Sequence, residues 1–210
     1  SDCVISNVKD ATHSIPRASM TDYPLMKPLR TESIDTEEAG WIEASRSDPA
    51  AFDWLYDRHV ARIYKYLYHR LGNHQDAEEI TSQTFLSALE KLGGYVHHGN
   101  FIGWLITIAR NKLTDFYRRE HPQQELDEEL SHSTVDDPLQ TVMAHERKRQ
   151  LQELIGSLSE EEQELLRLRF VAELSFREIG ELMQKSESAA KKQIYRIILR
   201  LQEQAEVKHD

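Results

Sequence analysis

The stretch NFIGWLITIARNKLTDFYRR, residues 100–119, places apolar side chains at the three-to-four-residue spacing of a helix with one buried stripe. The stripe comprises Ile102, Leu105, Ile106, Ala109, Leu113 and Phe116. The opposite face carries Thr107, Arg110, Asn111, Thr114 and Arg118. Hydroxyl, guanidinium and amide groups of this kind suit DNA phosphates and base edges. The stretch therefore predicts a helix that packs on one side and can bind nucleic acid on the other.

Aromatic side chains gather just before this helix and in its first turn. Tyr95 lies in the flexible stretch GGYVHHGN, residues 93–100, and Phe101 and Trp104 follow it. Planar rings can stack on unpaired bases, so the three residues are candidate base platforms. Aromatic residues at helical spacing are more often core residues, and this alternative applies above all to Phe101 and Trp104.

Composition predicts a soluble, helix-rich protein of one domain or two small ones. Of the 210 residues, 39% are hydrophobic and 30% are charged. No apolar run is long enough to span a membrane, and no basic segment followed by an apolar one resembles a secretory signal. The single cysteine, Cys3, rules out an internal disulfide and fits a reducing compartment. We therefore expect a cytoplasmic protein.

The net charge of −10 argues at first against nucleic acid, but the charge is unevenly distributed. Residues 50–119 hold 9 basic and 7 acidic side chains, and so do residues 165–210. Residues 120–164 between them hold 3 basic and 13 acidic side chains. Two mildly basic blocks are thus separated by an acidic one. The isolated chain is expected to bind DNA poorly, because phosphate neutralisation supplies most non-specific affinity.

The remaining patterns divide an all-α chain into two small helical domains joined by an acidic linker. Residues 1–35 show no periodicity and predict a mobile tail. Residues 36–119 predict a helical domain, with capping signals at Thr36 and at Asp48-Pro49, a stop at Gly72 and a further helix from about Asp76. The acidic, turn-rich residues 120–144 predict the linker. Residues 145–205 form the second domain, and residues 206–210 a short tail.

The second domain has the pattern of a helix-turn-helix. Capping boxes begin helices at Ser159 and Ser175, and Ser186 caps a longer last helix. A second helix of this kind enters the major groove. The candidate contacts to base edges and backbone are Glu187, Ser188, Lys191, Lys192, Gln193 and Arg196, with Arg177 on the preceding helix. Helical hairpins also occur as plain packing units, so this pattern alone leaves both interpretations open.

Three segments together resemble the sigma-70 family of bacterial transcription initiation factors. They are DAEEITSQTFLSALEKL, FIGWLITIARNKLTDFYRR and LSEEEQELLRLRFVAELSFREIGELMQKSESAAKKQIYRIILRL. The chain is most similar to the extracytoplasmic-function (ECF) group, which keeps only the second and fourth conserved regions. The resemblance covers roughly residues 36–119 and 145–204.

The resemblance implies three binding surfaces. Core RNA polymerase would be bound by Asp76, Glu78, Glu79, Gln83 and Thr84. The minus-ten element would be recognised and melted by Tyr95, Asn100, Phe101, Trp104, Arg110, Asn111, Thr114, Asp115 and Arg118. The last helix would bind the minus-thirty-five element as duplex. An anti-sigma factor is a further candidate partner.

Two departures from the family pattern stand out. Lys192 stands where many members have Ser, which implies a changed base preference or an added phosphate contact. Ile198 and Leu199 replace residues that are usually charged, and Leu199 lies off the buried stripe of the last helix. Our hypothesis is that Leu199 meets the other domain or an inhibitory partner.

An enzyme and a stand-alone regulator are the alternatives. His69, His74, His97 and His98 are accompanied by no metal-binding, phosphate-loop or catalytic-triad motif, so we expect no catalytic site, metal or cofactor. A stand-alone helix-turn-helix regulator remains open on pattern alone. Such a regulator binds duplex operator without polymerase, whereas a sigma factor needs the core enzyme.

Overall fold

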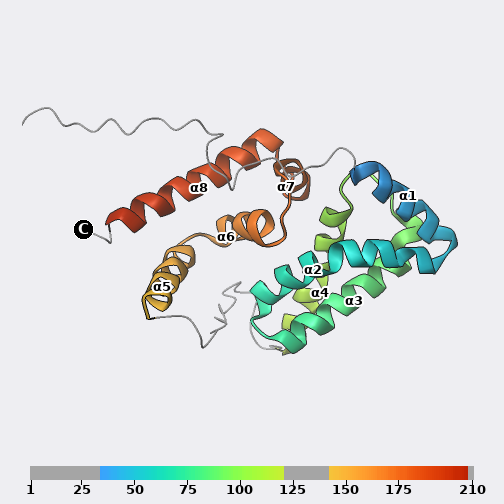
Figure 1. Cartoon of the computed structure of the whole chain (residues 1–210), viewed down its shortest axis with the longest axis horizontal. Coiled ribbons are helices and arrows are strands. Elements are labelled where there is room, and N and C mark those ends of the chain that lie inside the picture. Colours follow the sequence, from blue (N-terminus) through green and yellow to red (C-terminus); the bar gives the residue numbers. More distant parts are fainter. Residues whose placement is uncertain (1–33, 121–141, 208–210) are drawn as a thin grey trace, which may run out of the picture.

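The structure, a computed structural model, describes residues 34–120 and 142–207. Within these ranges the chain forms helices and turns and no strand, which confirms the all-α prediction (Figure 1). The amino-terminal half, residues 34–120, contains α1 (Ile34–Ser47), η2 (Pro49–Ala51), α2 (Phe52–Leu71), α3 (His74–Lys91), η3 (Leu92–Gly94) and α4 (Phe101–Glu120). The carboxyl-terminal half, residues 142–207, contains α5 (Val142–Gly156), α6 (Glu160–Leu166), η4 (Arg167–Val171), α7 (Phe176–Leu182) and α8 (Glu187–Val207).

Local capping residues fix most of the helix ends. The Asp48 carboxylate accepts a hydrogen bond from the Ala50 N–H at 3.0 Å, and Gly72 ends α2 in the left-handed region with φ 68°. The capping boxes at Ser159 and Ser175 are both present. These four sequence predictions are confirmed. α1, however, begins at Ile34 and includes Thr36, which was predicted as its cap.

The amino-terminal half is built around α2, α3 and α4. α3 packs against both α2 and α4. The apolar stripe of α4 is turned towards the protein core, as predicted. Leu55, Ile63 and Leu105 are fully buried. The apolar spacing of residues 52–71 predicts that Tyr56 is buried as well, but Tyr56 is 40% exposed. The Tyr56 ring instead covers the edge of Phe85 at 4.8 Å between centroids. This packing leaves the opposite face of α4 on the outside.

A buried acid–histidine pair ties α1 to α2. The His59 Nε2 and Glu38 Oε1 atoms lie 2.7 Å apart, and both residues are buried. Burial lowers the pKa of His59, so the folded protein holds the neutral ring. Burial alone would raise the pKa of Glu38, but the hydrogen bond from His59 and the positive charge of Arg58 outweigh it, and the pKa of Glu38 is lowered.

Acid is therefore expected to destabilise the protein as pH falls through the ordinary titration range of histidine, near 6.5. Because the pKa of His59 is lower in the folded state, the unfolded chain binds more protons there and the free energy of unfolding decreases as pH falls. The lowered pKa of Glu38 adds a second loss around and below its ordinary value of 4.5. Urea unfolding between about pH 8 and pH 5 measures the first effect. His59→Gln keeps an N–H donor for Glu38 but does not titrate, so it should flatten the slope; an unchanged slope would contradict this assignment.

The carboxyl-terminal half contains a helix-turn-helix formed by α7 and α8. The tight turn brings the Lys185 N–H to the Gly180 carbonyl oxygen at 2.7 Å. A Cβ atom on Gly180 would lie 2.8 Å from the Lys185 carbonyl oxygen, so a residue without a side chain is required there. The two helices cross closely for this reason, as the sequence pattern predicted.

Between α6 and α7 the helix continues as the wider π-helical turn η4. The Ala172 N–H bonds to the Arg167 carbonyl, five residues back, instead of four. The widened turn changes the direction of the following side chains. The apolar spacing after Ser159 predicts that Phe170 is buried, but Phe170 is 39% exposed, while Leu168 and Ala172 are fully buried.

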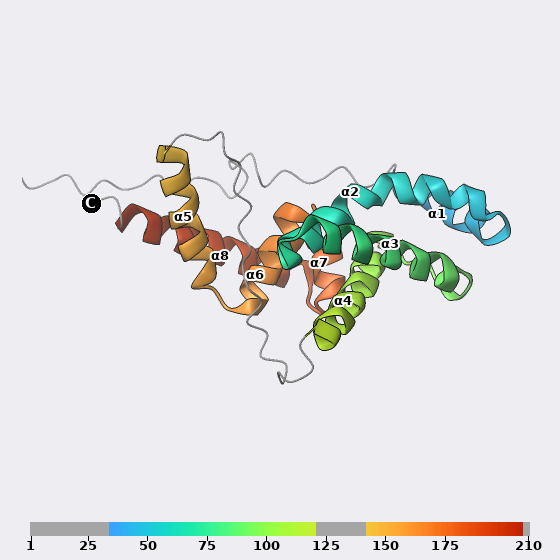
Figure 2. The same cartoon turned by 90° about the horizontal axis from the view of Figure 1, so that it is seen from below.

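The two halves pack against each other. η4 lies against α2, and α7 lies against α4, so the carboxyl-terminal half contacts the amino-terminal half along two elements (Figure 2). Buried hydrophobic residues of both halves form one continuous cluster. The sequence left open whether the two units fold together, and in the structure they do.

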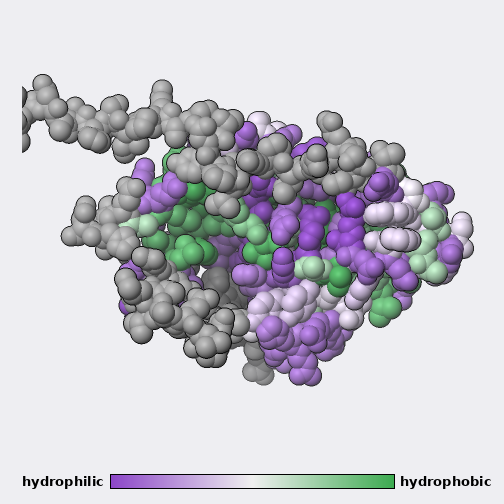
Figure 3. Space-filling view, viewed as in Figure 1, coloured by the Kyte–Doolittle hydropathy of each residue, from purple (hydrophilic) through white to green (hydrophobic). Residues whose placement is uncertain are grey.

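Exposed hydrophobic side chains remain on the carboxyl-terminal half. Figure 3 shows a hydrophobic area between α5, α6 and α8. Leu151 is 52% exposed and Leu199 is 49% exposed. Leu199 lies off the buried stripe, as predicted, but the hypothesis that the other domain buries it is wrong. The predicted amino-terminal tail up to residue 33 and the linker residues 121–141 lie outside the described residues.

Candidate nucleic-acid interface

The outer face of α4 carries the polar side chains that the sequence predicted. Six of them are exposed: Thr107, Arg110, Asn111, Thr114, Asp115 and Arg118. The Thr107 and Thr114 hydroxyls each donate to the carbonyl four residues back, at 2.9 Å. Their oxygen atoms remain outward as acceptors. Arg118 pairs with Asp115 at 3.5 Å, an exposed contact that DNA phosphates can readily replace.

An aromatic cluster lies at the amino end of this face. The Tyr95 and Trp104 rings lie 4.4 Å apart with a 30° tilt, and both residues are half-buried. Burial raises the pKa of Tyr95 to about 12, so its hydroxyl stays protonated. The pair presents a ring surface next to the polar face of α4, as a base platform requires. Phe101 lies beneath the pair and is fully buried, so its prediction as a DNA contact is wrong and the core alternative holds.

Asn100 has a structural role as well as a predicted DNA contact. Its side-chain oxygen accepts a hydrogen bond from the Gly103 N–H at 2.8 Å, in the manner of a helix cap. A Cβ atom on Gly103 would lie 2.5 Å from that oxygen. Gly103 thus allows the Asn100 side chain to fold over the start of α4. The side-chain nitrogen of Asn100 donates a hydrogen bond to the carboxyl-terminal half, at 2.9 Å from a Glu181 carboxylate oxygen.

A second surface lies on α3. Glu78 and Glu79 are exposed, and Asp76 and Gln83 are half-buried. The Gln83 amide donates to Glu79 at 2.8 Å. Thr84 does not belong to this surface, because it is fully buried and donates its hydroxyl to the Ile80 carbonyl. Its prediction as a polymerase contact is therefore wrong.

Sequence reasoning missed one residue of the α3 surface. Leu86 is 62% exposed and lies three residues after Gln83 and seven after Glu79, on the same helix face. The apolar spacing of this helix points to Phe85 and Leu89 as buried residues, and Leu86 lies outside that stripe. Helical spacing from the two polar residues could have identified it.

The third surface is the first half of α8. Five of the predicted residues are exposed there: Glu187, Ser188, Lys191, Lys192 and Arg196. Glu187 and Lys191 form one row at four-residue spacing, and Ser188, Lys192 and Arg196 form the neighbouring row. The Lys191 ammonium lies 5.9 Å from the Phe176 ring and 5.8 Å from the Tyr195 ring, which holds it towards α7.

The other two predicted residues of this surface, Gln193 and Arg177, form hydrogen bonds with side chains of the protein itself. Gln193 is half-buried and accepts a hydrogen bond from Lys185 at 2.7 Å. Arg177 on α7 is exposed and contacts Glu181 at 3.1 Å. Both would have to exchange these partners in order to contact DNA.

Residues 34–120 and 142–207 include no helix that is long and apolar enough to cross a membrane. Among the side chains described in those ranges, no group of three His, Cys, Asp or Glu residues is placed to hold a metal ion.

Family models account for both halves. The model of sigma-70 region 2 matches residues 55–122, and that of sigma-70 region 4 matches residues 148–201. Together the two segments cover more than half of the chain. The chain belongs to the sigma-70 family. The region boundaries place α4 of this sigma factor in region 2 and its helix-turn-helix in region 4.

Curated relatives place this sigma factor in the ECF group. The ECF RNA polymerase sigma factor BldN of Streptomyces coelicolor is 33% identical over 177 residues, which cover 80% of this chain and 67% of the relative. The RNA polymerase sigma factor YlaC of Bacillus subtilis is 30% identical over 151 residues, covering 70% of this chain and 87% of the relative. This sigma factor is therefore a promoter-specific transcription initiation factor that binds RNA polymerase. The interpretation as a stand-alone regulator is correspondingly disfavoured.

Solved structures support the fold. The complex of CnrH with the cytosolic domain of CnrY matches with a TM-score of 0.54 and 19% identity, covering 80% of this chain and 96% of the other. The sigma factor RpoE from Bartonella quintana, solved with the anti-sigma factor NepR, matches with a TM-score of 0.55 and 20% identity, covering 74% and 97%. At these identities the likeness concerns the fold alone.

Proposed function

We propose that this sigma factor uses the three surfaces of α3, α4 and α8 for polymerase, the minus-ten element and the minus-thirty-five element respectively. The observation that carries the proposal is the exposed polar face of α4 beside the Tyr95–Trp104 ring pair. Duplex bases cannot reach such a pair, so a base that stacks there must first leave the helix. The factor therefore captures unpaired bases of the minus-ten element and so promotes melting.

The residues of the minus-ten surface have distinct roles in this proposal. Tyr95 and Trp104 offer rings to unpaired bases. Arg110 and Arg118 contact phosphates, because a guanidinium matches a phosphate with two hydrogen bonds. The polar side chains that remain for base edges and sugars are Asn100, Asn111, Thr114 and Asp115.

Permanganate reactivity of thymines tests the melting step. Thymines of the minus-ten element should become reactive only when core polymerase and this factor are both present. Asn111→Ala should reduce the reactivity, because the exposed amide is lost from the surface while the core of α4 is unchanged. Reactive thymines without the factor, or equal reactivity with the variant, would contradict the assigned role.

The minus-thirty-five surface reads duplex DNA through α8. We assign base edges to Lys192, Arg196 and Gln193, and backbone contacts to Arg177, Ser188 and Lys191. Glu187, at the start of the helix, can accept a hydrogen bond from the amino group of cytosine. The positive charge of this half is small, so the surface needs polymerase to hold it on the promoter.

The polymerase surface comprises Asp76, Glu78, Glu79 and Gln83, to which we add Leu86. An exposed leucine next to carboxylates can fill an apolar site while the acidic groups pair with basic residues of the partner. We expect Leu86→Lys to weaken binding to core polymerase by about 1–3 kcal/mol, roughly 5- to 150-fold. Fluorescence anisotropy of the labelled factor measures the affinity.

Leu86→Met is the matched control for that variant, because it keeps an apolar side chain at the same position. It should bind polymerase nearly as well as the natural protein. Equal affinity of the lysine variant and the natural protein would remove Leu86 from the surface.

The remaining assignments complete the proposal. We propose residues 36–119 and 145–205 as the two functional domains, residues 120–144 as the linker, and residues 1–35 and 206–210 as tails. The factor acts in the cytoplasm, where the polymerase is, and it acts without catalytic activity of its own. An anti-sigma factor stays a predicted partner, testable by co-purification with the tagged full chain.

A further inference from the structure

The backbone of Tyr95 is bound by two different elements of the amino-terminal half. Tyr95 follows η3 in an extended conformation, with φ −74° and ψ 129°, and its N–H donates to the Leu92 carbonyl at 3.1 Å. The Tyr95 carbonyl is bound by α1 instead. A terminal nitrogen of Arg46, in the last turn of α1, donates a hydrogen bond to it at 2.5 Å. The residue that carries one ring of the proposed base platform is therefore held by η3 and by α1 together.

The sequence around Tyr95 permits many backbone conformations. Gly93 and Gly94 precede it, and Gly99 follows in the left-handed region with φ 79°. Glycine reaches more of the backbone conformational space than any other residue. Residues 95–100 form neither helix nor strand, so no regular hydrogen-bond pattern restricts them. A hydrogen bond from outside the loop, such as that of Arg46, therefore limits where the Tyr95 ring can lie.

The guanidinium of Arg46 is oriented by its own helix. Its other terminal nitrogen lies 3.2 Å from a carboxylate oxygen of Glu43, and this side chain is 74% exposed. An ion pair so exposed contributes little to stability. A charged donor on a carbonyl oxygen, in contrast, forms one of the stronger hydrogen bonds in proteins. The contact of Arg46 that matters most is thus the one to Tyr95.

α1 is itself fixed to the rest of the half. It packs against α2 and against η3. Ile42 in its middle is 2% exposed, and the buried Glu38–His59 pair joins its first turns to α2. These contacts leave little freedom to the helix, so Arg46 at its end reaches the loop from a rigid base.

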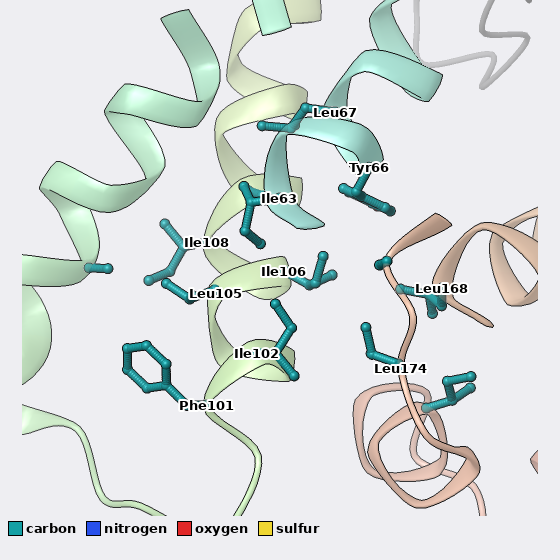
Figure 4. Close-up of a cluster of buried hydrophobic side chains, with 14 of the residues drawn as sticks. Ile63, Tyr66, Leu67, Phe101, Ile102, Leu105, Ile106, Ile108, Leu168 and Leu174 are labelled. Atoms are coloured by element: carbon teal, nitrogen blue, oxygen red, sulfur yellow. The ribbon is translucent and has the colours of Figure 1, made fainter. Parts of the chain in front are cut away.

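The ring pair is supported from below by the same elements. The Phe101 ring lies 5.5 Å from the Tyr95 ring, 5.4 Å from the Trp104 ring and 5.5 Å from the His59 ring. Figure 4 shows Phe101 at the start of α4, turned away from Leu168 of the other half. A continuous line of contacts thus runs from the buried acid–histidine pair through Phe101 to the two rings.

The charge of α1 also acts on the Tyr95 hydroxyl. Burial raises the pKa of Tyr95 to about 12, and the negative charge of Glu38 adds to the increase. The Glu38 carboxylate therefore lies close enough to Tyr95 to influence it. α1 contributes both the backbone contact and part of the electrostatic environment of this ring.

The position of α1 in the sequence separates it from the segment that carries the rings. The region 2 model matches residues 55–122, which include Tyr95 and Trp104, whereas α1 ends at Ser47. The hydrogen bond that fixes Tyr95 thus comes from a helix that precedes the matched segment.

We propose that Arg46 is a positioning residue for base capture. By holding the Tyr95 carbonyl, it keeps the Tyr95–Trp104 ring pair assembled before a base of the minus-ten element leaves the duplex. A preformed platform avoids the conformational cost of ordering the loop during binding. Arg46 acts through Tyr95 and not on DNA. This inference rests on the proposed role of the ring pair in melting.

A double-mutant cycle on the rate of promoter opening tests the inference. With core polymerase and a promoter labelled in the minus-ten element, Arg46→Met should slow opening roughly 3- to 10-fold, the effect of one lost hydrogen bond. When Trp104→Ala is already present, the ring pair no longer exists, and adding Arg46→Met should slow opening by less than about 2-fold. Glu43→Gln is the matched control. It removes the ion pair of Arg46 but keeps the hydrogen bond to Tyr95, so opening should proceed at the natural rate.

The other outcomes identify other roles for Arg46. Equal slowing in both backgrounds, together with a salt dependence of promoter binding that falls by about one phosphate, would mean a direct DNA contact and overturn the positioning role. A natural rate for Arg46→Met would overturn it as well. Urea unfolding of the full chain detects a general loss of stability. In that event Arg46→Gln, whose polar side chain is too short to reach the loop, decides by the same cycle.

The cycle also separates this inference from the proposed function. If Trp104→Ala slows opening and Arg46→Met does not, the positioning role fails while base capture by the ring pair stands. If Trp104→Ala leaves the rate unchanged, the ring pair is no base platform, and both claims fail.

Discussion

Trp104→Ala is expected to reduce the rate of promoter opening roughly 5- to 150-fold, because a base–aromatic stack contributes about 1–3 kcal/mol. Trp104 is the half-buried partner of Tyr95 at the start of α4, 4.4 Å from its ring. Without the indole, an unpaired base loses the ring of Trp104 as a stacking partner. Stopped-flow fluorescence of a promoter labelled in the minus-ten element measures the rate.

Two variants serve as controls for this prediction. Trp104→Phe keeps a ring and should retain much of the rate. Trp54→Ala removes a tryptophan of α2 that is 62% exposed and stacks on Trp41 of α1. An equal loss in the Trp54 variant would mean that the effect is not specific to the minus-ten surface.

Arg196→Ala is expected to weaken use of the minus-thirty-five element by about 1–3 kcal/mol, the usual contribution of a good base contact. Arg196 is exposed on the same face of α8 as Lys192. If it reads a base, the variant should also discriminate less at one position of the element. Competition between promoters with natural and substituted minus-thirty-five elements measures both effects.

Arg200→Ala is the matched control on the same helix. Arg200 lies one turn further along and pairs with Glu162 at 2.5 Å, so its charge is already engaged within the protein. It should leave base preference unchanged. A uniform loss across all sequences in the Arg196 variant would instead indicate a phosphate contact.

Local chemistry explains why much of the fold could be predicted. A cap is decided by residues within one turn, so Asp48, Gly72 and the two capping boxes were visible in the sequence. Periodicity likewise identified the inner and outer faces of α4. Both kinds of signal depend on short stretches of chain.

Long-range packing explains most of what was missed. Periodicity shows that Ile102 and Ile106 are buried but cannot show that they face Leu168 and Leu174 of the other half. The Glu38–His59 pair joins residues 21 positions apart that carry no local pattern. Contacts between distant segments have no signature in a single sequence.

The site predictions failed where one side chain could serve two purposes. Thr84 is the neighbour of the α3 surface residue Gln83 in sequence, but it lies on the face of α3 that packs into the core. Phe101 was open to a core or a DNA role, and the structure buries it fully. Asn100, a residue type that commonly caps helices, has its capping contact at the start of α4, but its interdomain contact to Glu181 has no signature in the sequence.

Run-off transcription with purified bacterial core polymerase on a library of promoters tests the central claim most directly. Specific transcripts are expected only when this sigma factor is present, and they should be lost when Trp104→Ala and Asn111→Ala are combined. The selected promoters should share two elements at a fixed spacing. No transcripts in the presence of core polymerase, together with tight binding of duplex DNA by the protein alone, would contradict the account.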